Sequence, residues 1–182
     1  MSSVRKIRYI TGRLGNAKGG LGAHLSGLSP DFEALAIDAT FLQRSFGEQV
    51  LATRAFCDIG ECHIIANSYG AYLYLQSLID HPPNPAKVML LSPVLGRAMN
   101  TERMLFSRPP REKTLRTAIE TQRLGMPSQL KIITGKDDES CDWKLATQFS
   151  AALGADITVL EGQGHTLDRE KISQAVASFL KN

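Results

Sequence analysis

The segment His63–Tyr72, "HIIANSYGAY", places a serine between two small residues directly after a short apolar run. An apolar run without alternating polar residues is typical of a strand that is buried on both faces of a sheet. The chain then turns at Ser68, and bulky side chains at Ala66 and Gly70 would collide in a sharp turn. The small residues on both sides of the serine therefore indicate a tight strand-to-helix turn.

The residues after Ser68 predict a helix from Tyr69 to about Asp80, which is apolar on most sides and stops before Pro82. A strand that ends in small-x-Ser-x-Gly and runs directly into a helix is the pattern of a nucleophile elbow. In this geometry the Ser68 hydroxyl is exposed at the end of the sheet. The first N–H groups of the helix point to the same place.

Apolar runs of similar length recur along the chain, each followed by a polar residue or glycine. They are "IRYIT" from Ile7, "ALAID" from Ala34, "HIIAN" from His63, "KVMLLSP" from Lys87, "LKIITG" from Leu130 and "ITVLEG" from Ile157. Segments with helical spacing lie between them, such as Leu42, Phe46 and Val50, and a last helix after Asp168, a predicted N-cap. This alternation predicts an α/β fold, a three-layer α/β/α sandwich with a mostly parallel, about six-stranded sheet.

The length of 182 residues fits one domain, 1–182, with a substantial core. One interval, residues 94–128, is expected to contain no further strand. It contains Pro109-Pro110 and a predicted helix from about Glu112 to Arg123. We expect this insertion to lie over the active-site edge of the sheet.

Composition and charge exclude several classes of protein. The net charge of +3 is well below that of a dedicated nucleic-acid binder. The apolar run near the N-terminus is too short for a signal peptide or a membrane span. The three cysteines, Cys57, Cys62 and Cys141, have no metal-ligand spacing, so we expect reduced thiols and a cytoplasmic protein.

A serine needs a base and an orienting acid to act as a nucleophile. The run from Leu130 ends in glycine and two acids, Asp137 and Asp138, and the run from Ile157 ends in a Gly-x-Gly-His loop that carries His165. All three groups would lie beyond the carboxyl ends of parallel strands, where open α/β sheets bind ligands. The remaining histidines, His24, His63 and His81, are less well placed to meet Ser68.

The order serine, acid, histidine with these motifs resembles the α/β-hydrolase superfamily over nearly the whole chain, from Ile7 to the last helix. The resemblance implies a minimal α/β-hydrolase fold and a Gly-x-x-Asp acid loop, which selects Asp138 and keeps Asp137 as the alternative. It also implies an oxyanion hole formed by the N–H groups of Tyr69 and of Arg13 in "ITGRLG". The short insertion and the "DDESCDWK" stretch resemble, less closely, the small cap-poor hydrolases of the retinoblastoma-binding-protein-like group.

Two departures from the superfamily pattern stand out: Ala66 where glycine is commoner, and Arg13 in an oxyanion loop that lacks the usual histidine. The resemblance implies a serine hydrolase that cleaves a small-molecule carboxylic ester or thioester through an acyl-serine intermediate. Neither a metal nor an organic cofactor is expected, nor is a nucleic-acid partner. The oligomeric state stays open.

Two other functions compete with this interpretation. The superfamily includes non-enzymes, so the alternative hypothesis is a protein-interaction module on the same fold. The glycine-rich "GRLGNAKGGLGAH" invites a phosphate-binding reading, but it matches neither the P-loop nor the dinucleotide template. The basic residues of the insertion are either a solvated surface or a clamp for an anionic part of the substrate; they are Arg97, Arg103, Arg108, Arg111, Lys113, Arg116 and Arg123.

Overall fold

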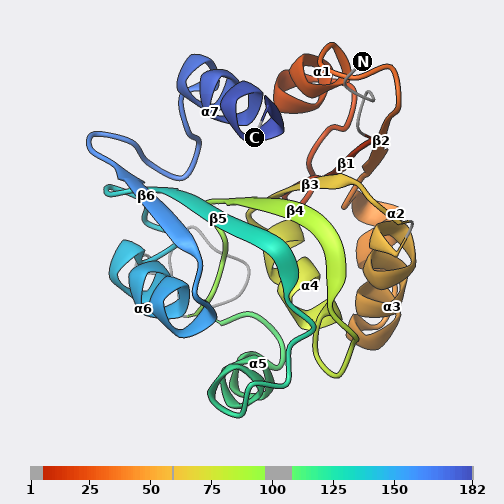
Figure 1. Ribbon diagram of the computed structural model, residues 1–182, viewed down its shortest axis with the longest axis vertical. Helices are drawn as coiled ribbons and strands as arrows, with labels where there is room; N and C mark the ends of the chain where they lie inside the picture. Colours follow the sequence, from red (N-terminus) through yellow and green to blue (C-terminus); the bar gives the residue numbers. More distant parts are fainter. Residues whose placement is uncertain (1–5, 59, 97–107, 182) are drawn as a thin grey trace.

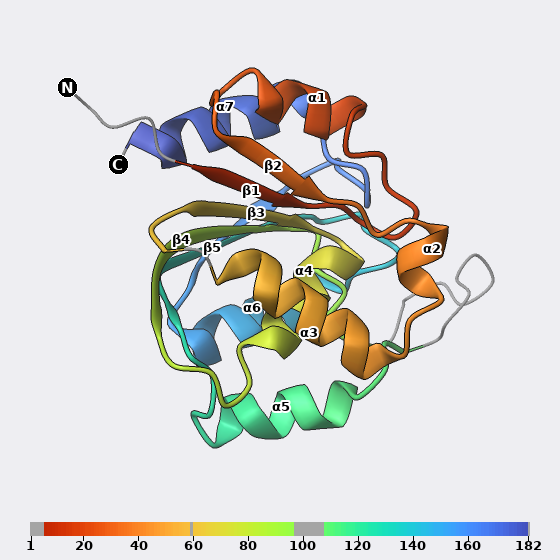
Figure 2. The ribbon, with the colours of Figure 1, turned by 90° about the vertical axis from the view of Figure 1, so that its right-hand side faces the viewer.

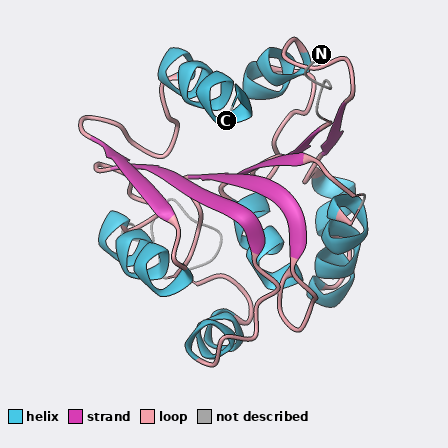
Figure 3. Ribbon diagram, viewed as in Figure 1, coloured by secondary structure: helices cyan, strands magenta, loops and turns pink. Residues whose placement is uncertain are grey.

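A six-stranded parallel sheet forms the centre of the protein (Figure 1). The computed structural model describes residues 6–58, 60–96 and 108–181. The strand order is β2-β1-β3-β4-β5-β6, and the sheet has a marked twist (Figure 3). The strands are β1 (Ile7–Ile10), β2 (Phe32–Leu35), β3 (His63–Asn67), β4 (Asn84–Leu91), β5 (Pro127–Gly135) and β6 (Asp156–Leu160).

Helices cover both faces of this sheet, which confirms the predicted three-layer α/β/α architecture (Figure 2). Helices α1 (Gly20–Ser26) and α7 (Arg169–Lys181) lie on one face. The other face carries α3 (Phe46–Cys57), α4 (Tyr69–Ser77) and α6 (Trp143–Leu153), with the short α2 (Ala39–Leu42) next to α3. Among the helices in the described ranges, none combines the length and apolarity needed to cross a membrane.

Successive side chains of a central strand point to opposite faces of the sheet, so one apolar run packs against both helical layers. Ile64 and Ala66 of β3 belong to the core cluster shared with α4, whereas Ile65 between them belongs to the cluster shared with α7. All three side chains are fully buried. A run without polar residues is therefore required wherever a strand has a helical layer on each side.

Two helix starts follow from capping residues. The predicted helical spacing through Leu42 and Phe46 is split between α2 and α3, because Ser45 and Glu48 form a capping box that starts a new helix. Asp168 is confirmed as the cap of α7, where its Oδ1 accepts a hydrogen bond of 3.0 Å from the Lys171 N–H.

The described part of the insertion forms α5 (Glu112–Glu120), which ends three residues earlier than predicted. Helix α5 lies outside the helical layer that contains α4 and α6 (Figure 2). The Tyr72 hydroxyl of α4 donates to the Pro110 carbonyl, and the Gln76 amide donates to the Arg111 carbonyl over 3.1 Å. Residues 97–107, on which the expected cover of the sheet edge also depends, lie outside the described residues.

The sheet order creates a crevice between β1 and β3. The chain leaves β1 through α1 on one face and leaves β3 through α4 on the other, so the two connections diverge at the carboxyl ends of neighbouring strands. Such a switch point is where open α/β sheets place their ligands. Ser68 follows β3 directly at this point.

Gly70 allows α4 to approach β1 closely. A Cβ atom at Gly70 would lie 2.2 Å from the Thr11 carbonyl oxygen and 2.8 Å from the Ile10 Cγ2. The three atoms nearest to that position belong to Ile10 and Thr11, and none belongs to Ala66. The end of β1 and the Thr11 carbonyl after it therefore exclude a side chain at residue 70, a contact that the elbow pattern did not predict.

Gly70→Ala should lower the free energy of unfolding by about 2 kcal/mol or more, because the added methyl group overlaps a carbonyl oxygen in a packed core. Gly47→Ala is the matched control in α3, since no atom lies within 4 Å of a Cβ there. The control should raise stability by up to about 1 kcal/mol. Urea unfolding followed by circular dichroism measures both, and a Gly70→Ala variant as stable as the wild type would contradict the close approach.

Candidate active site

Ser68 has an unusual backbone conformation at the junction of β3 and α4. Its φ of 52° and ψ of −117° are rarely adopted by a residue with a side chain. The Ser68 N–H donates to the Leu91 carbonyl of β4 over 2.8 Å, and its own carbonyl accepts from Tyr72 in the next helical turn. The sheet and the helix hold the strained residue in place, as expected where strain serves a site.

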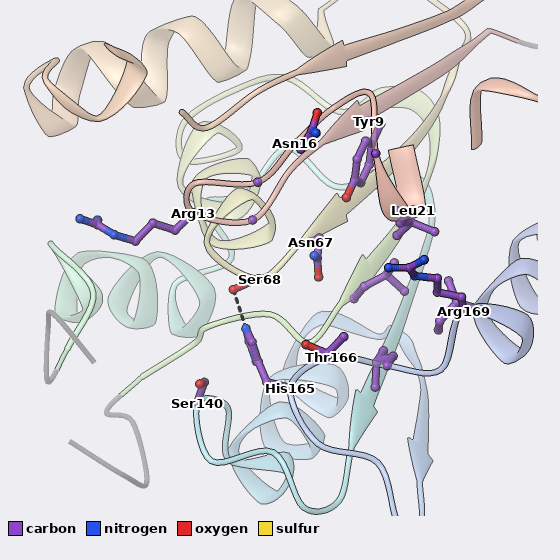
Figure 4. A pocket seen from close by; sticks show the side chains of 17 residues that line it. Tyr9, Arg13, Asn16, Leu21, Asn67, Ser68, Ser140, His165, Thr166 and Arg169 are labelled. Atoms are coloured by element: carbon purple, nitrogen blue, oxygen red, sulfur yellow. Dashed lines mark hydrogen bonds between the residues drawn. The ribbon is translucent and has the colours of Figure 1, made fainter. Parts of the chain in front are cut away.

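The structure brings Ser68, His165 and Asp138 together in a hydrogen-bonded series. The Ser68 Oγ and the His165 Nε2 are 2.8 Å apart (Figure 4). On the other side of the ring, Nδ1 lies 3.0 Å and 2.9 Å from the two carboxylate oxygens of Asp138. Because a carboxylate accepts hydrogen bonds, Nδ1 carries the hydrogen and Nε2 presents its lone pair to the serine.

Backbone N–H groups hold the Asp138 carboxylate in its orientation. Its Oδ1 accepts from the Ser140 N–H over 2.7 Å and from the Cys141 N–H over 3.0 Å. The side chain of Asp138 is 0% exposed, whereas that of His165 is 34% exposed. Asp137, the alternative acid, is exposed, and only its backbone N–H bonds to the histidine loop.

The acid loop and the histidine loop are joined by backbone contacts. The Asp137 N–H donates to the Gln163 carbonyl over 2.9 Å. A Cβ atom at Gly135 would lie 2.2 Å from that same carbonyl, so the end of β5 leaves room for the loop before His165 only because residue 135 is a glycine. The separation of Asp138 and His165 is thus set by the backbone.

The loop after β1 forms the other border of the site. A Cβ atom at Gly12 would lie 3.2 Å from the Ser68 Cβ, so this turn lies directly against the serine. The Thr11 hydroxyl fixes the turn, since it accepts from the Ile37 N–H over 2.8 Å and donates to the Gly12 carbonyl over 3.0 Å. Arg13, one predicted oxyanion donor, follows in this turn. Tyr69, the other, is the first residue of α4, whose N–H has no partner within the helix.

A cavity of about 620 Å³ opens beside Ser68 (Figure 4). One wall is the glycine-rich loop between residues 12 and 21, and the other is the segment between residues 165 and 172. Tyr9, Asn67 and Leu91 lie at the base. The volume falls in the range of ordinary small-molecule sites.

Other titratable side chains do not compete with these groups. Burial, together with the charge of Asp138, raises the pKa of the Cys141 thiol to about 12, so this neighbour stays a neutral thiol. The cysteines are free and buried. His24 lies on α1, His63 is buried in β3, and His81 contacts Asp58, so of the described histidines only His165 lines the cavity.

The basic residues of the insertion that the structure describes do not line the cavity. Arg116 pairs with Glu112, Arg123 pairs with Asp80, and the Arg111 guanidinium lies over the Phe46 ring. Arg97 and Arg103 lie outside the described residues.

Two described arginines line the cavity, the predicted Arg13 and Arg169 at the start of α7, and the sequence interpretation missed Arg169. It also missed Asn67 and Tyr9 at the base. Asn67 had a signal, because it precedes the serine directly. A single arginine at a helix start carries no signal in sequence, since such residues are common on surfaces.

A model of the serine hydrolase family matches residues 50–174, which is more than half of the chain. The matched range contains Ser68, Asp138 and His165, and it excludes the loop with Arg13. No curated protein matches the chain in sequence.

Solved structures similar to this protein include several hydrolases. The alpha/beta hydrolase domain-containing protein 10 from mouse has a TM-score of 0.69 and 13% identity, covering 97% of this chain and 89% of that chain. A CIB-like hydrolase from Thermoplasma acidophilum has a TM-score of 0.68 and 14% identity, covering 100% and 89%. Est1E from Butyrivibrio proteoclasticus has a TM-score of 0.65 and 14% identity, covering 99% and 89%.

At these identities the structural similarity establishes the fold, and the sequence model establishes the family. The chain therefore belongs to the serine hydrolase family, and it has the fold of the alpha/beta hydrolases among these structures.

Proposed function

We propose that this hydrolase cleaves a carboxylic ester or thioester through an acyl-serine intermediate, with Ser68 as nucleophile, His165 as base and Asp138 as orienting acid. The observation that carries the proposal is the hydrogen-bonded series from the buried Asp138 carboxylate through His165 to the Ser68 hydroxyl. The strained turn at Ser68 fits a nucleophile elbow, which presents the hydroxyl to a cavity.

In the first step, His165 Nε2 accepts the Ser68 proton while the serine oxygen attacks the substrate carbonyl carbon. The Asp138 carboxylate keeps the hydrogen on Nδ1 and stabilises the imidazolium that forms. Because the Ser140 and Cys141 N–H groups hold this carboxylate, the imidazole need not reorient during the reaction.

Negative charge develops on the carbonyl oxygen as the tetrahedral intermediate forms. The N–H of Tyr69 at the start of α4 and the N–H of Arg13 in the turn beside Ser68 are the donors that we assign to this oxyanion. The helix dipole of α4 adds to the stabilisation, because Tyr69 is its first residue.

Collapse of the intermediate expels the alcohol or thiol, which takes the proton from His165 and leaves the acyl group on Ser68 Oγ. A water molecule then loses a proton to His165 and attacks the acyl carbon. A second collapse releases the carboxylic acid and returns the proton to Ser68. Each proton thus passes through Nε2, the ring atom 2.8 Å from the serine oxygen.

Ser68→Ala should abolish covalent labelling by a fluorophosphonate probe and lower kcat on a short-chain thioester by about 10⁴ to 10⁶, the size of effect seen when a nucleophile of this kind is removed. Intact-mass spectrometry measures the adduct. Ser26→Ala, which removes an exposed hydroxyl from the end of α1, is the control and should label fully. A folded wild type that forms no adduct would favour the interaction module instead.

Asp138→Asn should lower kcat by about 10⁴ with the fold unchanged, because an amide at this position no longer enforces the hydrogen on His165 Nδ1. Asp137→Asn removes the same charge one residue earlier from an exposed side chain and should leave kcat within about twofold. Steady-state kinetics of the two variants separates the candidate acids, and the reverse result would transfer the role to Asp137.

Gly135→Ala should slow probe labelling of Ser68 by more than tenfold, since the added methyl group displaces the Gln163 carbonyl and with it the loop that carries His165. Gly164→Ala in the same loop is the control, because its Cβ would meet only the Asp137 carbonyl at 3.8 Å. Equal labelling rates for both folded variants would show that the contact at Gly135 does not position the histidine.

A further inference from the structure

The charged groups around the cavity are unbalanced. Arg13 and Arg169 line it, and no aspartate or glutamate is found among the described residues that line it. Within the described part of the chain, the Arg169 guanidinium makes no ion pair or hydrogen bond with a side chain. The cavity wall therefore presents a cation that is available to a ligand.

The Arg169 side chain lies on the side of the cavity opposite Ser68. Figure 4 shows Ser68 and His165 on one side and Leu21 and Arg169 on the other. A Cβ atom at Gly20 would lie 3.7 Å from an Arg169 terminal nitrogen, so the guanidinium lies beside the glycine-rich loop. Apolar side chains contribute to the lining as well; they are Leu21, Leu91, Leu167 and Ile172.

Hydrogen bonds of Gln163 and Asp168 fix the start of α7 relative to the loop that carries His165. The Asp168 N–H donates to the Gln163 side chain over 2.8 Å, and the Asp168 carboxylate caps α7. Ile172, one turn further, is anchored in the core. The start of α7 is thus hydrogen-bonded to the loop that carries His165. The position of the Arg169 Cα in the cavity wall is therefore fixed.

Arg13 does not replace Arg169 as the cation of this cavity. Burial raises the pKa of the Tyr69 hydroxyl, and the nearby charge of Arg13 lowers it in part. Figure 4 shows the Arg13 side chain extending away from Leu21 and Arg169. Tyr9 at the base is neutral, because burial raises the pKa of its phenol to about 12.

We propose that the substrate is an ester or thioester whose chain ends in a carboxylate, and that Arg169 is the specificity residue that binds this carboxylate. The inference rests on the proposed function and adds the substrate class. A guanidinium pairs with a carboxylate through two parallel hydrogen bonds. The apolar side chains between the two ends fit a short methylene chain.

The test compares matched thioesters of six-carbon acids, one with a free carboxylate at the far end of the acyl chain and one with a neutral primary amide there. The wild type should favour the anionic substrate in kcat/KM by about tenfold. Arg169→Ala should remove this preference by raising KM for the anionic substrate far more than KM for the neutral one. Lys171→Ala, which removes a charge from the same helix outside the cavity, should keep the preference.

A second pair places the carboxylate in the leaving group instead, with a neutral acyl chain. A preference that depends on Arg169 in either pair supports the proposal and identifies the half of the substrate that lies beside α7. Arg169→Glu should reverse the preference, favouring a substrate that ends in an ammonium group. The preference should also weaken between about 0.02 M and about 0.5 M salt, because Arg169 is exposed.

Probe labelling of Ser68 distinguishes a failure of the proposed role of Arg169 from a failure of the proposed hydrolase function. A wild type that labels normally but shows no preference in either pair would overturn the role of Arg169 and leave the proposed hydrolase intact. A preference that survives in Arg169→Ala would overturn it equally. Absence of labelling in folded wild type would instead overturn the proposed function, and the substrate class with it.

Discussion

The close approach of helix α4 to the end of β1 is the constraint on which the site depends. No side chain fits at residue 70, since a Cβ there would overlap the Thr11 carbonyl. This approach brings the start of α4 next to the loop after β1, and Gly12 in that loop lies against Ser68. The switch point of the sheet supplies the space, and the strained backbone at Ser68 directs the hydroxyl into it. A larger residue at either glycine would separate the elements that the proposed chemistry requires together.

A second constraint is electrostatic. The Asp138 side chain is removed from water, which is costly for a carboxylate unless hydrogen bonds replace its hydration. Two backbone N–H groups and the His165 ring supply them. Because the Ser140 and Cys141 N–H groups belong to the loop that follows β5, the carboxylate is oriented before any ligand arrives. Half-exposed His165 then connects a buried charge to an open cavity, a gradient in solvent access that suits a group passing protons in both directions.

The fold was predictable because its determinants are local. Unbroken apolar runs such as the one at Ile64 specify doubly covered strands, and Ser45 or Asp168 mark helix starts by their capping chemistry. The candidate site was predictable to the extent that its residues lie in loops shortly after strands, as Asp138 does after β5 and His165 after β6. The reason for Gly70 was not, because its partner Thr11 is distant in sequence. Neither was Arg169, which enters the cavity only through the packing of α7 beside the glycine-rich loop.

Helix α4 also has consequences for the motions of the site. Its residues from Gly70 to Ser77 are all buried, between the sheet on one side and α3, α5 and α6 around the other. Such an element opens only when the whole domain unfolds, whereas exposed loops open at far lower free energy. The end of the cavity that carries Ser68 is thus attached to a buried helix, whereas the glycine-rich wall belongs to a partly exposed segment. Ligands of different lengths would be accommodated by movement of that wall, while the geometry at the serine stays constant.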